Sequence, residues 1–165
     1  RCFDEVSRKE WDRGLRDQQP LTLLLLDVDS FKKFNDFYGH GEGDNCLHNI
    51  GQALKASVMR TSDVVARYGG EEFVILLPNT KVGGGIKVAE RVSSFVDGLA
   101  IKHEYSDAAA HVTISIGITS MTADHEHSIT DMLKQADIAL YQAKANGRHQ
   151  YVVYSDITTS PTASA

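Results

Sequence analysis

Five of the six residues 21–26 are leucines, and the run leads directly into Asp27. A short apolar run of this kind predicts a strand buried on both faces, at the centre of a sheet. Such a strand needs cover on both sides, and much of the remaining chain has the periodicity of amphipathic helices. The run therefore indicates helices layered over a sheet.

Strand and helix patterns alternate along the chain. Helices are predicted over residues 3–15, 31–34, 44–58, 82–96 and 129–145. Further strands are predicted at 63–68, 73–77, 112–119 and 150–154, with a loop at 39–43. Gly69 and Gly70 predict a tight hairpin turn between two of these strands. We therefore predict an α/β (α+β sandwich) fold, with a mixed central sheet flanked by helices and a protruding β-hairpin.

The 165 residues suit one domain, predicted at 1–155, followed by a disordered polar tail at 156–165. The net charge of -5 argues against a general nucleic-acid binder, because such proteins neutralise phosphates with cations. Cys2 and Cys46 have neither metal-ligand spacing nor a disulfide framework, which favours a reducing, cytosolic setting. Cys46 is expected to be a small buried residue.

The chain shows no apolar run long enough to span a bilayer and no signal peptide. It begins within a helical pattern, so we expect a domain excised from a longer parent. Membrane anchoring of that parent stays open.

Carboxylates are concentrated at two places, Asp27-Val28-Asp29 after the apolar run and Glu71-Glu72 at the hairpin tip. If the hairpin tip lies beside the strand end, these side chains form a cluster that a cation would stabilise. Hard oxygen ligands suit Mg²⁺ or Mn²⁺ carrying phosphates. Taken singly, each feature has a simpler interpretation, as a turn or cap residue and as a solvated hairpin.

Several ordered motifs resemble those of the GGDEF domains of diguanylate cyclases. They cover most of the chain, from Phe3 to Tyr154, at compatible spacing. The matching segments are Asp27–Asp36, Tyr38–His40, Gly43–Asp44, Arg67–Phe73, Ser115–Ile118 and Ala136–Arg148. The resemblance implies a palm-like fold similar to that of nucleotidyl cyclases and the condensation of two GTP molecules into cyclic di-GMP.

The resemblance also implies metal and catalytic residues. Asp27, Glu71 and the backbone carbonyl of Val28 would ligate Mg²⁺ or Mn²⁺, and Glu72 would assist with a second metal. Glu71 would also accept the proton of the attacking ribose hydroxyl, and Lys32 would stabilise the transition state. The Glu at position 71 stands where the family more often has Asp.

Substrate and inhibitor contacts are implied in the same way. Asn35 and Asp44 match the guanine-reading pair, with simpler interpretations as a helix C-cap and a helix N-cap. Further substrate contacts are expected from the residues Ser30 (also a predicted N-cap), Phe31, Lys32, His40, Lys144 and Arg148. Arg60, Asp63 and Arg91 match the family's product-inhibition site.

The family's working form implies a homodimer, an upstream sensory domain in the parent chain and a bacterial cytoplasmic location. Two alternatives differ in class from this interpretation. One is a binding module that holds GTP or cyclic di-GMP without turnover. The other is a nucleotidyl cyclase that forms a mononucleotide ring. Intact carboxylates at 27 and 71 argue against the first, and Asn35 and Asp44 argue against the second.

Overall fold

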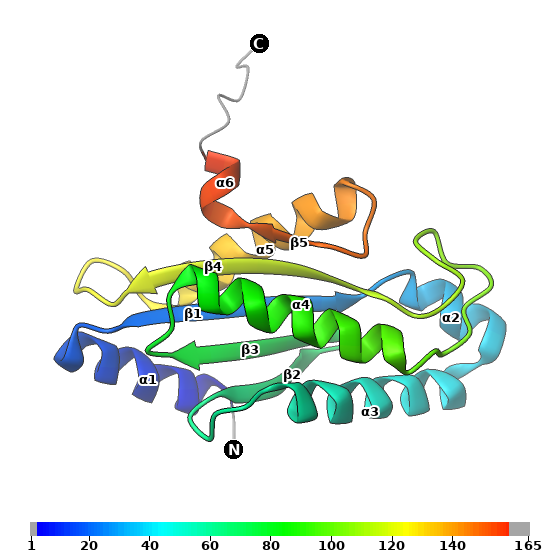
Figure 1. The fold of residues 1–165 in the computed structure, drawn as a ribbon, viewed down its shortest axis with the longest axis horizontal. Helices are drawn as coiled ribbons and strands as arrows, with labels where there is room; N and C mark the ends of the chain where they lie inside the picture. Colours follow the sequence, from blue (N-terminus) through cyan, green and yellow to red (C-terminus); the bar gives the residue numbers. More distant parts are fainter. Residues whose placement is uncertain (1–2, 159–165) are drawn as a thin grey trace, which may run out of the picture.

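A computed structural model describes residues 3–158 of the chain. Helices and strands alternate as the sequence predicts, and Figure 1 shows their arrangement. In chain order the elements are α1 (Phe3–Asp17), β1 (Pro20–Val28), α2 (Phe31–Tyr38), α3 (His40–Ser57), β2 (Val64–Gly69), β3 (Glu72–Pro78), α4 (Val82–Gly98), β4 (Ile114–Thr122), α5 (Ile129–Ala145), β5 (Tyr151–Val153) and α6 (Tyr154–Thr158).

The sheet is mixed and has the strand order β2-β3-β1-β4-β5. The leucine-rich strand β1 is central, and it pairs antiparallel with both β3 and β4. The hairpin strands β2 and β3 are also antiparallel, whereas β4 and β5 are parallel. The α/β (α+β sandwich) prediction of a mixed sheet flanked by helices is confirmed.

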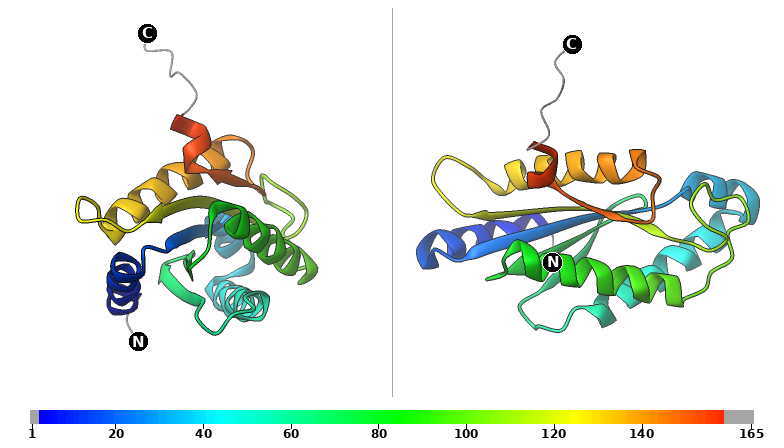
Figure 2. Two further views of the ribbon diagram at one scale, coloured as in Figure 1. Left: turned by 60° about the vertical axis from the view of Figure 1, so that its left-hand side comes forward. Right: turned by 45° about the horizontal axis from the view of Figure 1, so that its top comes forward.

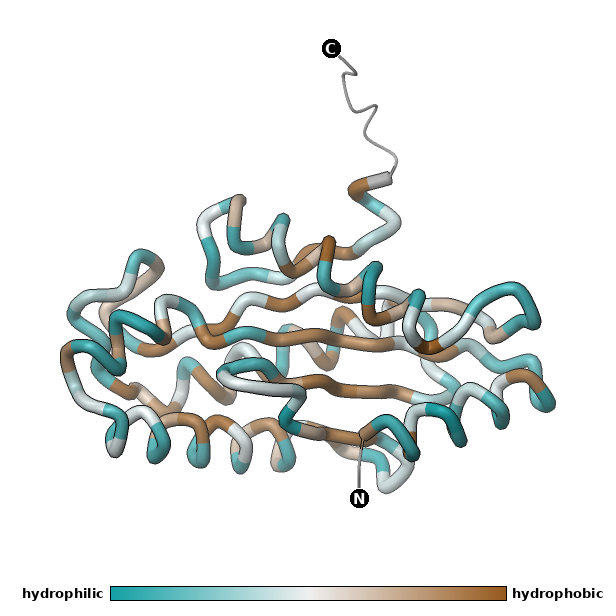
Figure 3. Tube along the Cα trace, turned by 180° about the vertical axis from the view of Figure 1, so that it is seen from behind, coloured by the Kyte–Doolittle hydropathy of each residue, from teal (hydrophilic) through white to brown (hydrophobic). Residues whose placement is uncertain are grey.

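Alternate residues of β1 enter two different cores. Leu24 and Leu26 pack under α2, α3 and α4, whereas Leu23 and Leu25 face the layer that contains α1 and α5. Figure 2 shows these helices on the two faces of the sheet. In Figure 3 the apolar colouring follows the strands, while the helices alternate between apolar and polar residues. Burial on both faces explains why β1 has almost no polar residue before Asp27.

Helix α5 lies unusually close to β4 at Gly117. A Cβ atom at this position would lie 2.1 Å from the carbonyl oxygen of Ala136 and 2.4 Å from the backbone nitrogen of Leu140. Only glycine allows this approach. The helix begins with a capping box, in which the Asp131 carboxylate accepts from the backbone N–H of Ser128 at 2.8 Å. The close packing at Gly117 fixes α5, and therefore its C-terminal turn, relative to the central strands.

The sequence interpretation was wrong about the start of α3. Residues 40–43 are helical and not a loop, because Gly39 alone, with φ of 89°, makes the turn between α2 and α3. Asp44 consequently lies inside the helix and is not its N-cap. Asn35 lies within α2 and is not a C-cap, since the helix continues to Tyr38.

The last segment also differs from expectation. The strand ends at Val153, and Tyr154–Thr158 form a short helix where we predicted a strand end and the start of a tail. Residues 159–165 of the predicted tail, and Cys2, lie outside the described residues. Cys46 is buried, as expected, and burial raises the pKa of its thiol to about 11. Within residues 3–158, no helix combines the length and apolarity that crossing a membrane requires.

Candidate metal and nucleotide site

The end of β1 and the tip of the β2–β3 hairpin lie side by side. Asp27 is the register partner of Glu72, and the backbone N–H of Val28 donates to the carbonyl of Glu71 at 3.3 Å. The hairpin turns at Gly70, whose φ is 45°, and the Arg67 guanidinium donates two hydrogen bonds to its carbonyl oxygen. Asp27 and Glu71 therefore belong to one site, although they lie 44 positions apart in the sequence.

Asp27 is only 5% exposed, and Lys144 reaches it from the last turn of α5. The Lys144 ammonium donates to the Asp27 carboxylate with an N–O distance of 2.6 Å. Burial nevertheless raises the pKa of Asp27 to about 6, because desolvation outweighs the attraction to Lys144, and the charges of Glu71 and Glu72 add to the rise. Burial is also the largest cause of a raised pKa at Glu72.

These residues fit a divalent cation of the Mg²⁺ type. Asp27, Glu71 and Glu72 offer only carboxylate oxygens. Burial, and to a smaller extent the charges of Glu71 and Glu72, raise the pKa of Asp27, and a bound cation would oppose both effects by stabilising its charged form. One lysine cannot balance three carboxylates, so the site keeps an excess of negative charge. A hard metal ion is the partner that this donor set favours.

Asp29 holds the end of β1 to β4, a role that the sequence interpretation did not assign to it. It is 1% exposed and accepts hydrogen bonds from the hydroxyls of Thr113 (2.7 Å) and Ser115 (2.5 Å) and from the backbone N–H of His149 (3.1 Å). These partners satisfy a buried carboxylate that would otherwise be costly. The Asp-x-Asp spacing therefore combines one candidate ligand with one structural anchor.

The turn after β1 is held by residues that are distant in the sequence. Ser30 occupies the predicted N-cap position of α2, but its φ is 53° and its side chain makes no cap hydrogen bond. Its hydroxyl is instead hydrogen-bonded to the Asp107 carboxylate, and the ring of buried His103 donates to its carbonyl oxygen at 3.0 Å. Phe31 is buried, whereas Lys32 is exposed beside the site.

Asn35 and Asp44 are the two residues expected to read guanine, and Asn35 packs against Gly43, the residue before Asp44. A Cβ atom at Gly43 would lie 1.8 Å from the side-chain oxygen of Asn35, so the amide packs directly against α3. That Asn35 oxygen is buried and lacks a hydrogen-bond partner in the described part of the chain. Asp44 is exposed and, with Arg67, lines a hollow of about 530 Å³. His40 is exposed at the first turn of α3.

Comparisons with known proteins agree with these motifs. The sequence model of the family described as "Diguanylate cyclase, GGDEF domain" matches residues 1–150. The chain belongs to the GGDEF family. Diguanylate cyclase A of Treponema denticola is 41% identical over 133 residues, which are 81% of this chain and 35% of that protein. This chain thus spans about a third of the length of that curated relative.

Solved GGDEF structures share the fold. The active GGEEF domain of a diguanylate cyclase from Vibrio cholerae is 31% identical, with a TM-score of 0.77 over 92% of this chain and 93% of that one. The GGDEF domain of DgcB from Caulobacter crescentus, crystallised with c-di-GMP, has a TM-score of 0.82 at 25% identity, over 93% and 88% of the two chains. Like the Vibrio domain, this GGDEF domain has Glu at the third position of the motif.

The remaining predicted substrate residue, Arg148, follows α5 in a left-handed backbone conformation with φ of 65°. Its backbone N–H donates to the carbonyl of Ala143 at 3.0 Å, which closes the end of the helix. Lys144 and Arg148 therefore leave the same end of α5, and Lys144 already contacts Asp27. The turn at Asn146-Gly147 forms as predicted, with a Gly147 φ of 117°.

The three predicted inhibitory residues of the GGDEF domain form a second cluster. Arg60 lies 3.6 Å from the Asp63 carboxylate, and the charge of Arg91 also acts on Asp63. Burial, the largest cause, raises the pKa of Asp63 against the opposing effect of both arginines. Arg91 in addition donates to the carbonyl of Ser57 at 2.6 Å. The cluster thus places two arginines near one carboxylate whose side chain is only 5% exposed.

Proposed function

We propose that this domain is a diguanylate cyclase, which condenses two GTP molecules into cyclic di-GMP and releases two pyrophosphates. The proposal rests chiefly on the position of Asp27, at the end of β1, next to Glu71 and Glu72 of the hairpin and in contact with Lys144. Membership of the GGDEF family and the identity to a named diguanylate cyclase support it.

Asp27, Glu71 and the carbonyl of Val28 would hold Mg²⁺ or Mn²⁺, with Glu72 assisting a second ion. A bound ion of this kind neutralises phosphate charge and lowers the pKa of a nearby hydroxyl. Asp27 is buried at the end of β1, and β1 is paired with β3 on one side and β4 on the other. This packing keeps the carboxylate oxygens of Asp27 oriented.

Glu71 accepts the proton of the ribose 3′-hydroxyl in our proposal. The freed 3′-oxygen attacks the α-phosphorus of the opposite GTP, and the bond from that phosphorus to the β-phosphate bridge breaks. Pyrophosphate then leaves with the bonding electron pair. Carboxylates are competent bases for such a transfer when they lie within hydrogen-bond reach of the hydroxyl.

Cations and backbone amides around the cluster would bind the phosphates. Lys32 is exposed at the start of α2, and the backbone N–H groups of Ser30 and Phe31 lie at the N-terminus of the same helix. Lys144 and Arg148 would reach the triphosphate from the end of α5. Lys32 would then stabilise the charge that develops in the transition state.

Asn35 and Asp44 would select guanine, with His40 as a further contact. A carboxylate can accept from guanine N1–H and from its exocyclic amine, and adenine offers no such pair. Among residues 3–158 the buried side-chain oxygen of Asn35 has no hydrogen-bond partner, which supports this role, because a buried polar atom without a partner is uncommon unless a ligand completes it.

Catalysis requires two GTP-bound domains that face each other, so we propose a homodimer as the working form. Product would bind at Arg60, Asp63 and Arg91 and inhibit the enzyme, because guanidinium groups grip phosphates and guanine edges. For the parent protein we propose a bacterial cytoplasmic location for this domain and control by an upstream sensory domain.

The test is to incubate the domain with GTP and Mg²⁺ and to identify the products by mass spectrometry, at several protein concentrations. We expect cyclic di-GMP, with a specific activity that rises with protein concentration. GTP binding without any product would favour the binding-module alternative, and a cyclic mononucleotide would favour the other cyclase class.

A further inference from the structure

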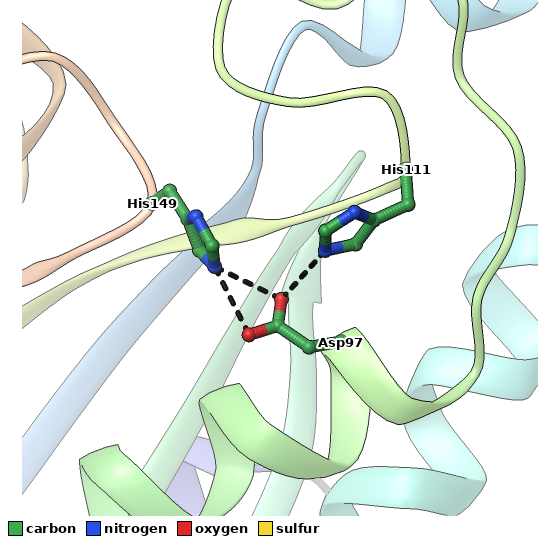
Figure 4. Close-up of side chains that lie close together, drawn as sticks. All are labelled: Asp97, His111 and His149. Atoms are coloured by element: carbon green, nitrogen blue, oxygen red, sulfur yellow. Dashed lines mark hydrogen bonds and ion pairs between the residues drawn. The ribbon is translucent and has the colours of Figure 1, made fainter.

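Three side chains outside the proposed catalytic site converge on one point. Asp97 lies in the last turn of α4, His111 lies just before β4, and His149 lies between α5 and β5. Figure 4 shows that all three point toward one another although they come from distant parts of the chain. Their candidate ligand atoms all lie within 4.8 Å of one another.

The distances are close to those of a metal site. The ring nitrogen Nε2 of His149 lies 2.9 Å from one Asp97 oxygen and 3.0 Å from the other, and Nε2 of His111 lies 3.1 Å from the first. Ligand atoms of a tetrahedral zinc ion are about 3.4 Å apart, given zinc bonds of about 2.0–2.1 Å. Side-chain shifts of the order of 1 Å therefore convert the cluster into three arms of a tetrahedron.

The backbone aims the His149 side chain in an uncommon way. Arg148 and His149 are consecutive non-glycine residues with positive φ, 65° and 51°. Such conformations are disfavoured for ordinary side chains and persist only where the surroundings determine them. Here the backbone N–H of His149 is held by the buried Asp29 carboxylate, which fixes the main chain from which the ring reaches Asp97.

A metal ion could reach this cluster from solvent. Asp97 and His149 line a surface hollow of about 420 Å³, which is also lined by Glu90, about two turns before Asp97 on the same face of α4. The side chains of Asp97 and of both histidines are about one-third exposed, so a fourth ligand position can face water. An acidic residue beside the entrance favours an approaching cation.

We infer that Asp97, His111 and His149 form a binding site for a divalent transition metal, with Zn²⁺ the best match. Two imidazoles and one carboxylate are donors that suit Zn²⁺, whereas Mg²⁺ prefers an all-oxygen set. The site is therefore distinct in chemistry from the one at Asp27. The inference stands on this geometry alone and does not depend on the proposed cyclase activity.

A metal at this position links three segments. It would tie the end of α4 and the segment before β4 to the α5–β5 turn, whose His149 also anchors Asp29. Because Asp29 lies two residues from Asp27, the bound metal would restrain the strand end that carries this candidate metal-ligating carboxylate. Binding to the folded state alone also stabilises that state.

The experiment is calorimetric titration of the domain with ZnCl₂ in excess Mg²⁺, which occupies sites made of oxygen ligands. We expect one zinc ion per chain. His111→Gln and His149→Asn should each weaken zinc binding at least about tenfold. Asparagine is chosen at 149 because it tolerates the positive φ there. Repeating the titration with Glu71→Gln should leave the zinc affinity unchanged.

His127→Gln is the matched control, because the His127 ring contacts a single carboxylate, Asp124, at 2.9 Å. It should bind zinc like the wild type. Co²⁺ added to the unmodified protein gives a second readout, the intense visible absorption of tetrahedral cobalt, which zinc should abolish. No zinc bound by the wild type, equal binding by the cluster variants, or a weak octahedral cobalt spectrum would each overturn the inference.

Discussion

The ammonium group of Lys144 lies 2.6 Å from the carboxylate of Asp27, and the two residues are 117 positions apart. This contact joins the end of α5 to the end of the central strand. Lys144 can lie there because α5 packs directly on β4 at Gly117. In the metal-free protein, Lys144 therefore partly offsets the charge of Asp27, which a bound cation would offset more fully.

Asp27→Asn should stabilise the metal-free protein at neutral pH. The pKa of Asp27 is raised from 3.8 to about 6, so its contribution to stability is intact below about pH 4 and is lost as pH rises to about pH 6. Asn carries no charge and avoids that loss. In EDTA, the unfolding free energy of the variant should exceed that of wild type by about 1–3 kcal/mol at neutral pH and by little at about pH 4.

Asp124→Asn is the control for that measurement. His127 lowers the pKa of Asp124, chiefly through a side-chain hydrogen bond, so the charged form of Asp124 favours folding. As pH rises through the titration range of Asp124, Asp124→Asn should therefore become less stable relative to the wild type. The sign of this change is opposite to that expected for Asp27→Asn. If the difference in unfolding free energy between Asp27→Asn and the wild type does not change with pH, the charged form of Asp27 does not destabilise the folded protein.

Gly43→Ala should weaken GTP binding. The new methyl group would overlap the Asn35 side-chain oxygen, which must move away from its place against α3. We expect about tenfold lower affinity for a non-hydrolysable GTP analogue and a loss of about 1–3 kcal/mol in stability. Gly41→Ala is the control, since nothing lies within 4 Å of a Cβ there, and it should gain up to about 1 kcal/mol of helix stability. Equal GTP affinity in both variants would exclude a role for Asn35.

Gly117→Ala should be far more damaging. Its Cβ would meet backbone atoms of Ala136 and Leu140, which cannot rotate away as a side chain can. We expect a loss of more than about 3 kcal/mol, measured by chemical denaturation. Gly51→Ala offers the comparison, because its Cβ would be 3.7 Å from the Phe73 ring, an ordinary contact. If both variants are equally stable, α5 does not pack on β4 as closely as described.

Arg91→Ala should relieve product inhibition. Arg91 and Arg60 both act on Asp63, and loss of one guanidinium removes a phosphate grip from the proposed inhibitory site. We expect inhibition by added cyclic di-GMP to weaken at least about tenfold, measured as initial rates across product concentrations. Arg8→Ala, at an exposed position of α1, is the control and should be inhibited by cyclic di-GMP like the wild type. If inhibition of Arg91→Ala by cyclic di-GMP is unchanged, the product does not inhibit by binding at Arg91.

The strands and the long helices could be predicted because burial repeats along the sequence. Leucines on both faces of β1 and the periodic residues of α5 leave little choice of structure. The start of α3 could not be predicted in this way. Gly39, Gly41 and Gly43 all lower helix propensity, and the close packing of Gly43 against Asn35 overrides that tendency.

The candidate site was predicted through motifs, and its supporting residues were not. Asp107 holds Ser30 from 77 positions away, and Asp29 is anchored by residues 84 to 120 positions away. Such contacts leave no periodic signal, since they depend on how β4 and the segments on either side of it meet β1. The same reason hides the meeting of Asp97 with two distant histidines.

The proposed cyclase activity and the role of Glu71 are tested together by comparing cyclic di-GMP formation by the wild type and by Glu71→Gln. Both proteins are incubated with GTP and Mg²⁺ at a concentration that favours dimers, products are quantified by mass spectrometry, and circular dichroism verifies folding. We expect cyclic di-GMP from the wild type and a rate at least about 1,000-fold lower in the variant, because a base and a metal ligand are lost together. A folded Glu71→Gln that forms product at the wild-type rate would rule out the proposed role of Glu71.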